Sequence, residues 1–141
     1  MVQEKNPCAV IHWKSGKVKH VVSGAYDAEI LALSEGLEEA IIIRKQLLAM
    51  TGLPKEMIEI EGFSDSRGAV EAIGGTTQGI FRGKSIGIEV AKIKEMRDTK
   101  EVAKITWLDG VFEIADGLTK PRKGASREPV LQAIEKGRFM Y

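Results

Sequence analysis

Met57-Ile-Glu-Ile-Glu-Gly-Phe63 alternates apolar and polar residues and runs directly into Ser64-Asp65-Ser66. Alternation with a period of two is typical of a half-buried strand. Asp65 and Ser66 are both suited to cap a short helix, which we expect over Arg67–Ile73. Residues 57–73 therefore predict a strand that turns directly into a helix, which is the local pattern of a layered protein with mixed strands and helices.

Further elements are indicated on both sides of this strand. Apolar residues recur with a helical period through Ile30, Leu37 and Leu48, and Thr51-Gly52-Leu53-Pro54 supplies a stop signal. We also expect a hairpin over Cys8–Trp13 and Val18–Val22, helices over Tyr26–Met50 and Ser85–Arg97, a strand over Val102–Trp107, a short helix over Val111–Leu118 and a final helix over Glu128–Lys136. This order predicts an α/β or α+β layered domain, with the strands near 57–63 and 102–107 as parallel neighbours.

Length and composition bound the class of protein. The chain has 141 residues, of which 43% are hydrophobic and 29% are charged, and this balance argues against wholesale disorder. We expect a single domain over 1–141, with a core over 8–121 and a helical extension over 122–141. No apolar run approaches the roughly 20 residues of a membrane span, and the start carries no secretory signal. We therefore expect a cytoplasmic protein with no membrane partner; one cysteine and two histidines argue against a disulfide and a structural zinc site.

The net charge of the chain is +1, from 21 Lys and Arg against 20 Asp and Glu. This balance is not that of a protein covered in basic charge for nucleic acid. Local basic clusters remain, and each is interpreted either as solvated loop charge or as part of a nucleic-acid face. The clusters are Lys14, Lys17, Lys19 and His20; Arg82 and Lys84; and Lys120, Arg122, Lys123 and Arg127.

Three acidic residues stand at places where an α/β protein binds ligands. Glu29 lies in the first turn of the long helix, Asp65 follows a strand, and Asp116 lies in the short helix after the last strand. Carboxylates at the carboxyl ends of strands can hold divalent cations, and a pair of such cations supports phosphodiester hydrolysis. Each residue also has a plainer interpretation: Glu29 as a favourable charge on the helix dipole, Asp65 as an N-cap, and Asp116 as a solvated carboxylate.

Several motifs occur in an order that resembles one known family. They are Trp13-Lys-Ser-Gly-Lys17, Asp27-Ala28-Glu29 followed by Leu31-Ala32-Leu33, Ser64-Asp65-Ser66 with Ala69 and Ile73, Arg82-Gly83-Lys84-Ser85-Ile86, and Ile114-Ala115-Asp116-Gly117-Leu118-Thr119-Lys120-Pro121. The set resembles the ribonuclease H domain of copia-type LTR retrotransposon Pol polyproteins, and the last motif is the most specific.

The resemblance implies a ribonuclease H-like α/β fold, a mixed sheet flanked by helices, and hydrolysis of the RNA strand of an RNA·DNA hybrid. It implies that Glu29, Asp65 and Asp116 bind Mg²⁺ or Mn²⁺ as the catalytic carboxylates of a two-metal site. It further implies that Arg82 and Lys84 contact the nucleic acid. The expected location widens to retrotransposon particles or the nucleus.

The chain departs from the family pattern in ways that bear on activity. The family has a further carboxylate on an opening strand, in a Tyr-x-Asp-Ala-Asp segment, and this sequence starts downstream of it, so we expect the fold to lack that strand. Ser85, Gly87 and Ser66 stand where the family has a histidine, an acidic residue and an asparagine. We expect weak or absent cleavage by this chain alone. The alternative is a non-catalytic degenerate or domesticated domain that binds nucleic acid, or forms a homodimer at the missing-strand position.

Overall fold

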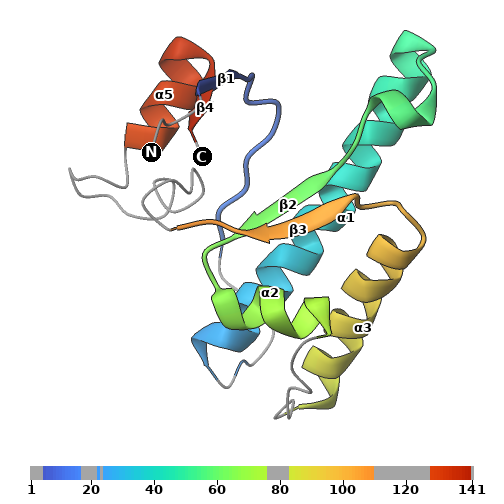
Figure 1. Cartoon of the computed structure of the whole chain (residues 1–141), viewed down its shortest axis with the longest axis vertical. Helices are drawn as coiled ribbons and strands as arrows, with labels where there is room; N and C mark the ends of the chain where they lie inside the picture. The colour runs from blue at the N-terminus through green and yellow to red at the C-terminus, as the bar shows by residue number, and fades with distance from the viewer. Residues whose placement is uncertain (1–4, 17–21, 23, 76–82, 110–127, 141) are drawn as a thin grey trace. The chain divides into compact units, whose positions relative to one another are not determined.

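A computed structural model of the chain describes residues 5–16, 22, 24–75, 83–109 and 128–140. The chain divides into two compact units, one formed by residues 18–107 and one by residues 1–17 together with 108–141. The elements are β1 (Lys5–Pro7), α1 (Ala25–Thr51), the 3-10 helix η1 (Lys55–Met57), β2 (Glu61–Ser64), α2 (Arg67–Gly74), α3 (Lys84–Asp98), β3 (Lys104–Trp107), α5 (Glu128–Lys136) and β4 (Arg138–Met140). Figure 1 shows these elements along the chain.

The unit of residues 18–107 is built on two parallel strands. β2 pairs with β3 in a register that runs from Glu61 opposite Lys104 to Ser64 opposite Trp107. The parallel pairing confirms the prediction from sequence, and α2 and α3 lie between the two strands in the chain. The first strand is shorter than expected, because residues 55–57 form η1 and pairing begins only where the Ala103 amide donates to the Ile60 carbonyl, at 2.8 Å.

The helices of this unit match their predicted positions closely. α1 has 27 residues and ends at Gly52, whose φ of 67° and amide bond to the Leu48 carbonyl at 2.9 Å form the expected left-handed stop. α2 and α3 extend the expected helices by one residue at most at each end. Ser66 holds the N-cap position of α2, but its side chain makes no capping hydrogen bond.

Helix α1 runs antiparallel to the strands against which it packs. A Cβ placed on Gly68, in the first turn of α2, would lie 3.7 Å from the ring of Tyr26 in the first turn of α1. A Cβ on Gly62, within β2, would lie 3.3 Å from Leu37 and 3.6 Å from Leu33. The start of α1 therefore lies at the carboxyl end of β2, as Figure 1 also shows.

The apolar core of this unit is formed by the facing sides of the three helices and by residues that flank the strands. α1 and α3 contribute the helical positions that the sequence periodicity indicated. The buried members are Ile30, Leu37, Ile60, Ala69, Ile73, Ile86, Val90, Ile93 and Val102. The buried Ser34 hydroxyl donates to the Glu89 carboxylate at 2.5 Å, so a polar contact also joins α1 to α3.

The second unit joins the two ends of the chain. β1 pairs antiparallel with β4, so that Lys5 lies opposite Met140. α5 spans the predicted residues and ends at Gly137, whose φ is 58°; the Gly137 carbonyl accepts from the Cys8 amide at 2.7 Å. Neither β1 nor β4 was expected from the sequence.

The predicted hairpin is corrected in part. Residues 8–16 have no regular structure, so the expected strand over Cys8–Trp13 is wrong. Of its second half only Val22 is described, and it too is irregular. The expected helix over Val111–Leu118 lies outside the described residues.

The described parts of the molecule mix helices and strands in the α/β manner. The single domain over 1–141 stays a prediction. No helix in the described ranges is long and apolar enough to cross a membrane.

Candidate functional site

Asp65 lies at the carboxyl end of β2 with an exposed side chain. Its main-chain carbonyl accepts a hydrogen bond from the indole Nε1 of Trp107 at 3.1 Å, which ties it to the end of β3. The Ser66 amide donates to the Ser64 hydroxyl at 3.2 Å, and Ser66 rather than Asp65 is the N-cap of α2. The plainer interpretation of Asp65 as a helix cap is therefore wrong, and its carboxylate faces solvent where a ligand has access.

Glu29 lies at the same end of the unit. It is one turn beyond Tyr26, whose ring packs against Gly68 just after Asp65 in the chain. Glu29 is exposed, and because α1 begins at Ala25, the acidic residue in its first turn is Asp27. The favourable charge on the helix dipole thus belongs to Asp27 and not to Glu29.

The first turn of α1 is partly buried against α2, and the pKa of Tyr26 in this turn reflects that burial. Burial raises the pKa of the Tyr26 hydroxyl, and the neighbouring Asp27 carboxylate raises it further. Tyr26 is therefore neutral near pH 7 and acts as a packing residue at this end of the unit. Its contact with Gly68 sets the position of α1 relative to the β2–α2 turn that carries Asp65.

Of the two basic candidates, Lys84 lies within the described residues. Lys84 is the first residue of α3 and is exposed, a position where the helix dipole disfavours a positive charge. A favourable contribution to helix stability therefore does not explain why a lysine stands at position 84. Asp116 and Arg82 lie outside the described residues. Within the part of the chain that the structure describes, no group of three or more His, Cys, Asp or Glu side chains is arranged to hold a metal ion.

The two candidate ligands that the structure describes have the chemistry that a hard divalent cation requires. Carboxylate oxygens are the ligands that Mg²⁺ and Mn²⁺ prefer, and Glu29 and Asp65 present exposed carboxylates at one end of the parallel strand pair. This is also the end where open α/β sheets bind ligands. The structure thus places the start of α1, which carries Glu29, and the end of β2, which precedes Asp65, at the same end of the unit.

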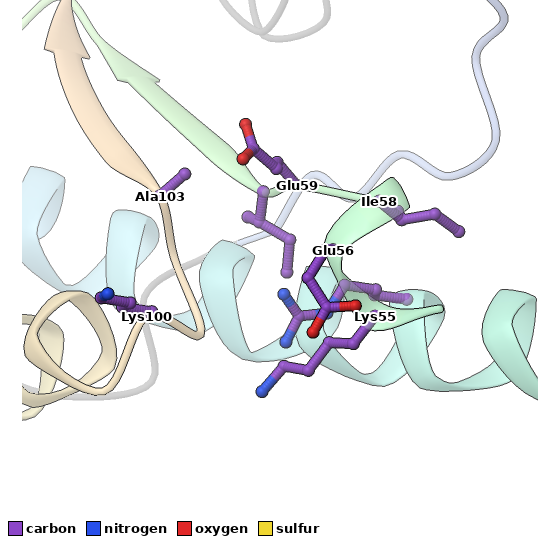
Figure 2. Close-up of a pocket in the computed structure, with 8 residues that line it drawn as sticks. Lys55, Glu56, Ile58, Glu59, Lys100 and Ala103 are labelled. Carbon is purple, nitrogen blue, oxygen red and sulfur yellow. The ribbon is translucent and has the colours of Figure 1, made fainter. Parts of the chain in front are cut away.

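A cavity of about 240 Å³ lies at the opposite end of the strands, lined by Arg44, Lys55, Glu56, Ile58, Glu59, Ile60, Lys100 and Ala103. Figure 2 shows Lys100 and Ala103 on one side of it and Lys55 and Glu56 on the other. Buried Arg44 donates to the Glu101 carbonyl at 3.0 Å and pairs with the Glu101 carboxylate, which Lys55 also contacts at 2.8 Å. Basic and acidic groups neutralise each other here, so the cluster fastens α1 to the α3–β3 connection.

Sequence reasoning missed two features that the structure makes prominent. The Arg44–Glu101 pair joins residues 57 positions apart, and no local pattern signals such a pair. Trp107 is 45% exposed, and its indole is bonded to the Asp65 backbone across the strand pair. Its position as the last residue of a strand, beside a candidate site, was the available signal.

Comparison of this chain with protein-family models, with curated proteins and with solved structures finds no match.

Proposed function

We propose that this chain is a ribonuclease H-like domain of retrotransposon type, which binds an RNA·DNA hybrid and divalent cations at the carboxyl end of β2. One observation carries the proposal. Glu29 and Asp65 were selected from sequence motifs 36 positions apart, and the antiparallel course of α1 brings the elements that bear them to one end of the unit.

Glu29, Asp65 and Asp116 would hold the Mg²⁺ or Mn²⁺ ions. When bound, the cations would supply water activation and charge stabilisation at the scissile phosphate. The backbone at Asp65 is held by the Trp107 indole, and the start of α1, just before Glu29, is held by the packing of Tyr26 against Gly68. Lys84 and Arg82 would contact the phosphates of the hybrid, a sequence-independent interaction that weakens with salt.

Cleavage by this chain alone is expected to be weak or absent. The family pattern uses four carboxylates, and the motifs here supply three. Removing one carboxylate from a two-metal site weakens the binding of both ions, because the shared ligand offsets their mutual repulsion. Hybrid binding and metal binding are separate from cleavage in this proposal and are the properties to measure.

The test is a titration of the isotopically labelled chain with Mg²⁺ and Mn²⁺, followed by amide chemical shifts, with a cleavage assay of a labelled RNA·DNA hybrid on the same sample. We expect saturable shifts around residues 29, 65 and 116, with little cleavage. Asp65→Asn and Glu29→Gln should each weaken metal binding about tenfold or more, from the loss of one ligand charge. Asp98→Asn is the matched control, because Asp98 is exposed at the far end of α3.

One result would count against this function, and a second would overturn only the expected level of activity. Shifts spread evenly over the acidic residues, unchanged in Asp65→Asn, would show that no metal site exists. Vigorous Mg²⁺-dependent cleavage that disappears in Asp65→Asn would support the site but overturn the expectation of weak activity.

A second candidate function is a non-catalytic homo-oligomeric module. The observation that favours it is the exposed apolar segment Val10–Trp13, in which Ile11 is 69% exposed and no strand forms. Exposed apolar chain with strand-like composition is prone to pair with another chain. This function predicts self-association, whereas the first predicts metal and hybrid binding.

A further inference from the structure

We propose that the second half of α1 is an interaction surface that pairs, antiparallel, with the same helix of a second copy of this chain. The surface is centred on Ile42, and none of its residues belongs to the candidate metal site. This contact is therefore independent of the proposed function, and it differs from self-association through the segment Val10–Trp13.

The second half of α1 carries more apolar residues than the core uses. Residues 40–43 and 47–50 are all apolar, and Ile41 is the last residue of α1 that packs in the core of the described unit. Figure 1 shows the final turns of α1 extending past the strands. A helix that is apolar all round is normally covered on every side. This half of α1 therefore has an apolar side that its own unit does not cover.

That side is open to solvent. Ile42 is 52% exposed and Met50 is 82% exposed, and Ala49 between them along the chain is exposed as well. Arg44 does not mask these residues, because it is buried and bonded to Glu101. Removing such apolar side chains from water favours association with a second helix.

The charges beside Ile42 fit a second copy of the same helix. Glu38 precedes Ile42 by four residues and Lys45 follows it by three, so the three residues share one side of α1. An antiparallel pair related by a two-fold axis at Ile42 places Glu38 of each copy beside Lys45 of the other. A parallel pair would instead place like charges together. The charge pattern therefore selects the antiparallel homodimer.

Both charges are accessible to a second copy. The Glu38 side chain is 43% exposed; its carboxylate contacts Lys92 of α3 and has acceptor positions left for a further donor. Lys45 is exposed and makes no hydrogen bond or ion pair within the part of the chain that the structure describes. The pairing thus adds contacts without breaking those that hold α1 to α3.

Sedimentation equilibrium of the full-length chain tests this contact. We expect the weight-average mass to rise with concentration toward twice the 15.5 kDa of one chain. Ile42→Lys should weaken the dimer at least about tenfold, because two lysines then face each other at the two-fold axis. Circular dichroism checks that this variant is folded. Ile88→Lys is the matched control, since Ile88 is 64% exposed but lies on α3.

A charge swap distinguishes the contact from a loss of stability. Lys45→Glu and Glu38→Lys each place like charges together between the two copies, and each should weaken the dimer about fivefold. The double variant restores opposite charges and should recover association. Glu38→Lys also removes the contact with Lys92, but the double variant lacks that contact too, so its loss cannot produce the recovery.

Three results would overturn the α1 contact: a parent chain that stays monomeric at every concentration, association that Ile42→Lys leaves unchanged, or a double variant that recovers nothing. Association that Ile11→Lys abolishes and Ile42→Lys retains assigns the contact to Val10–Trp13. The metal and hybrid titrations test the proposed function separately, so either proposal can fail without the other.

Discussion

At the scale of single residues, Arg44 shows how a charge becomes part of a core. It is 4% exposed in the middle of α1, yet two of its guanidinium nitrogens are bonded to Glu101, one to the carbonyl and one to the carboxylate. Removing one partner of such a pair leaves a desolvated charge without compensation, which costs more than the pair itself contributes. The neighbouring Lys55, half exposed, bonds to the same carboxylate but has water as an alternative.

We expect Glu101→Gln to lower the free energy of unfolding by about 1–3 kcal/mol at pH 7, because Arg44 loses its anionic partner. Lys55→Gln removes only an exposed charge and should cost less than about 1 kcal/mol. Urea denaturation of both variants and the parent checks this. An equal decrease in the free energy of unfolding in the two variants would show that the Arg44–Glu101 ion pair contributes no more to stability than the exposed Lys55–Glu101 pair.

The same residue predicts a pH dependence. The hydrogen bond from Lys55 is the largest cause that lowers the pKa of Glu101 below its usual 4.5, and the charges of Arg44, Lys55 and Lys45 add to it, while burial opposes them. A carboxylate with a lowered pKa stabilises the folded state above the unfolded pKa and loses this effect as the pH falls through the folded value. The difference in stability between the parent and Glu101→Gln should therefore be constant from pH 7 to about 5 and shrink below about 4.5. A difference that grows on acidification would contradict this.

At the scale of elements, the contact of α1 with β2 depends on a residue without a side chain. A Cβ on Gly62 would lie 3.3 Å from both Ile105 and Leu37, which is closer than comfortable packing allows. Gly62 therefore permits the close approach of helix and strand that puts the start of α1 beside Asp65. Its role is to set a distance, and it does not depend on a positive φ.

We expect Gly62→Val to destabilise the chain by about 1–3 kcal/mol, because its methyl groups overfill the space between β2 and α1. Gly68→Ala is the matched control: its Cβ would meet the Tyr26 ring at an ordinary 3.7 Å, and alanine is the better helix former. Thermal unfolding of both variants tests the contrast. A Gly62→Val chain as stable as the parent would show that α1 and β2 are not in close contact.

The elements also show what local sequence could predict. α1, α3 and α5 were found because helical periodicity and the stops at Gly52 and Gly137 are local signals. The pairing of β1 with β4 joins the two ends of the chain, and no local pattern reports such a distant partner. The candidate site divides in the same way: Asp65 was placed by the strand before it, whereas its proximity to the start of α1 depends on tertiary packing. The bond from Trp107 to Asp65 likewise crosses between strands.

At the scale of the whole molecule, the segment Val10–Trp13 carries several exposed apolar side chains in sequence. The sequence predicted a strand over Cys8–Trp13, and the structure leaves these residues irregular, with Ile11 69% exposed. Strand-forming residues that make no ladder within one chain can form one between two chains. The second candidate function follows from this segment and not from the carboxylates, so the two can be separated by experiment.

The homo-oligomeric function predicts that the parent chain self-associates through this segment, so that its weight-average mass in sedimentation equilibrium rises above 15.5 kDa as the concentration increases. Ile11→Lys should abolish the rise, because a buried lysine opposite its own copy is both desolvated and repelled. Ile88→Lys is the control, since Ile88 is similarly exposed but lies on α3. A parent chain that remains monomeric at every concentration removes the homo-oligomeric function and leaves nucleic-acid binding as the remaining proposal. Self-association that persists in Ile11→Lys but fails in Ile88→Lys would instead place the interface on α3.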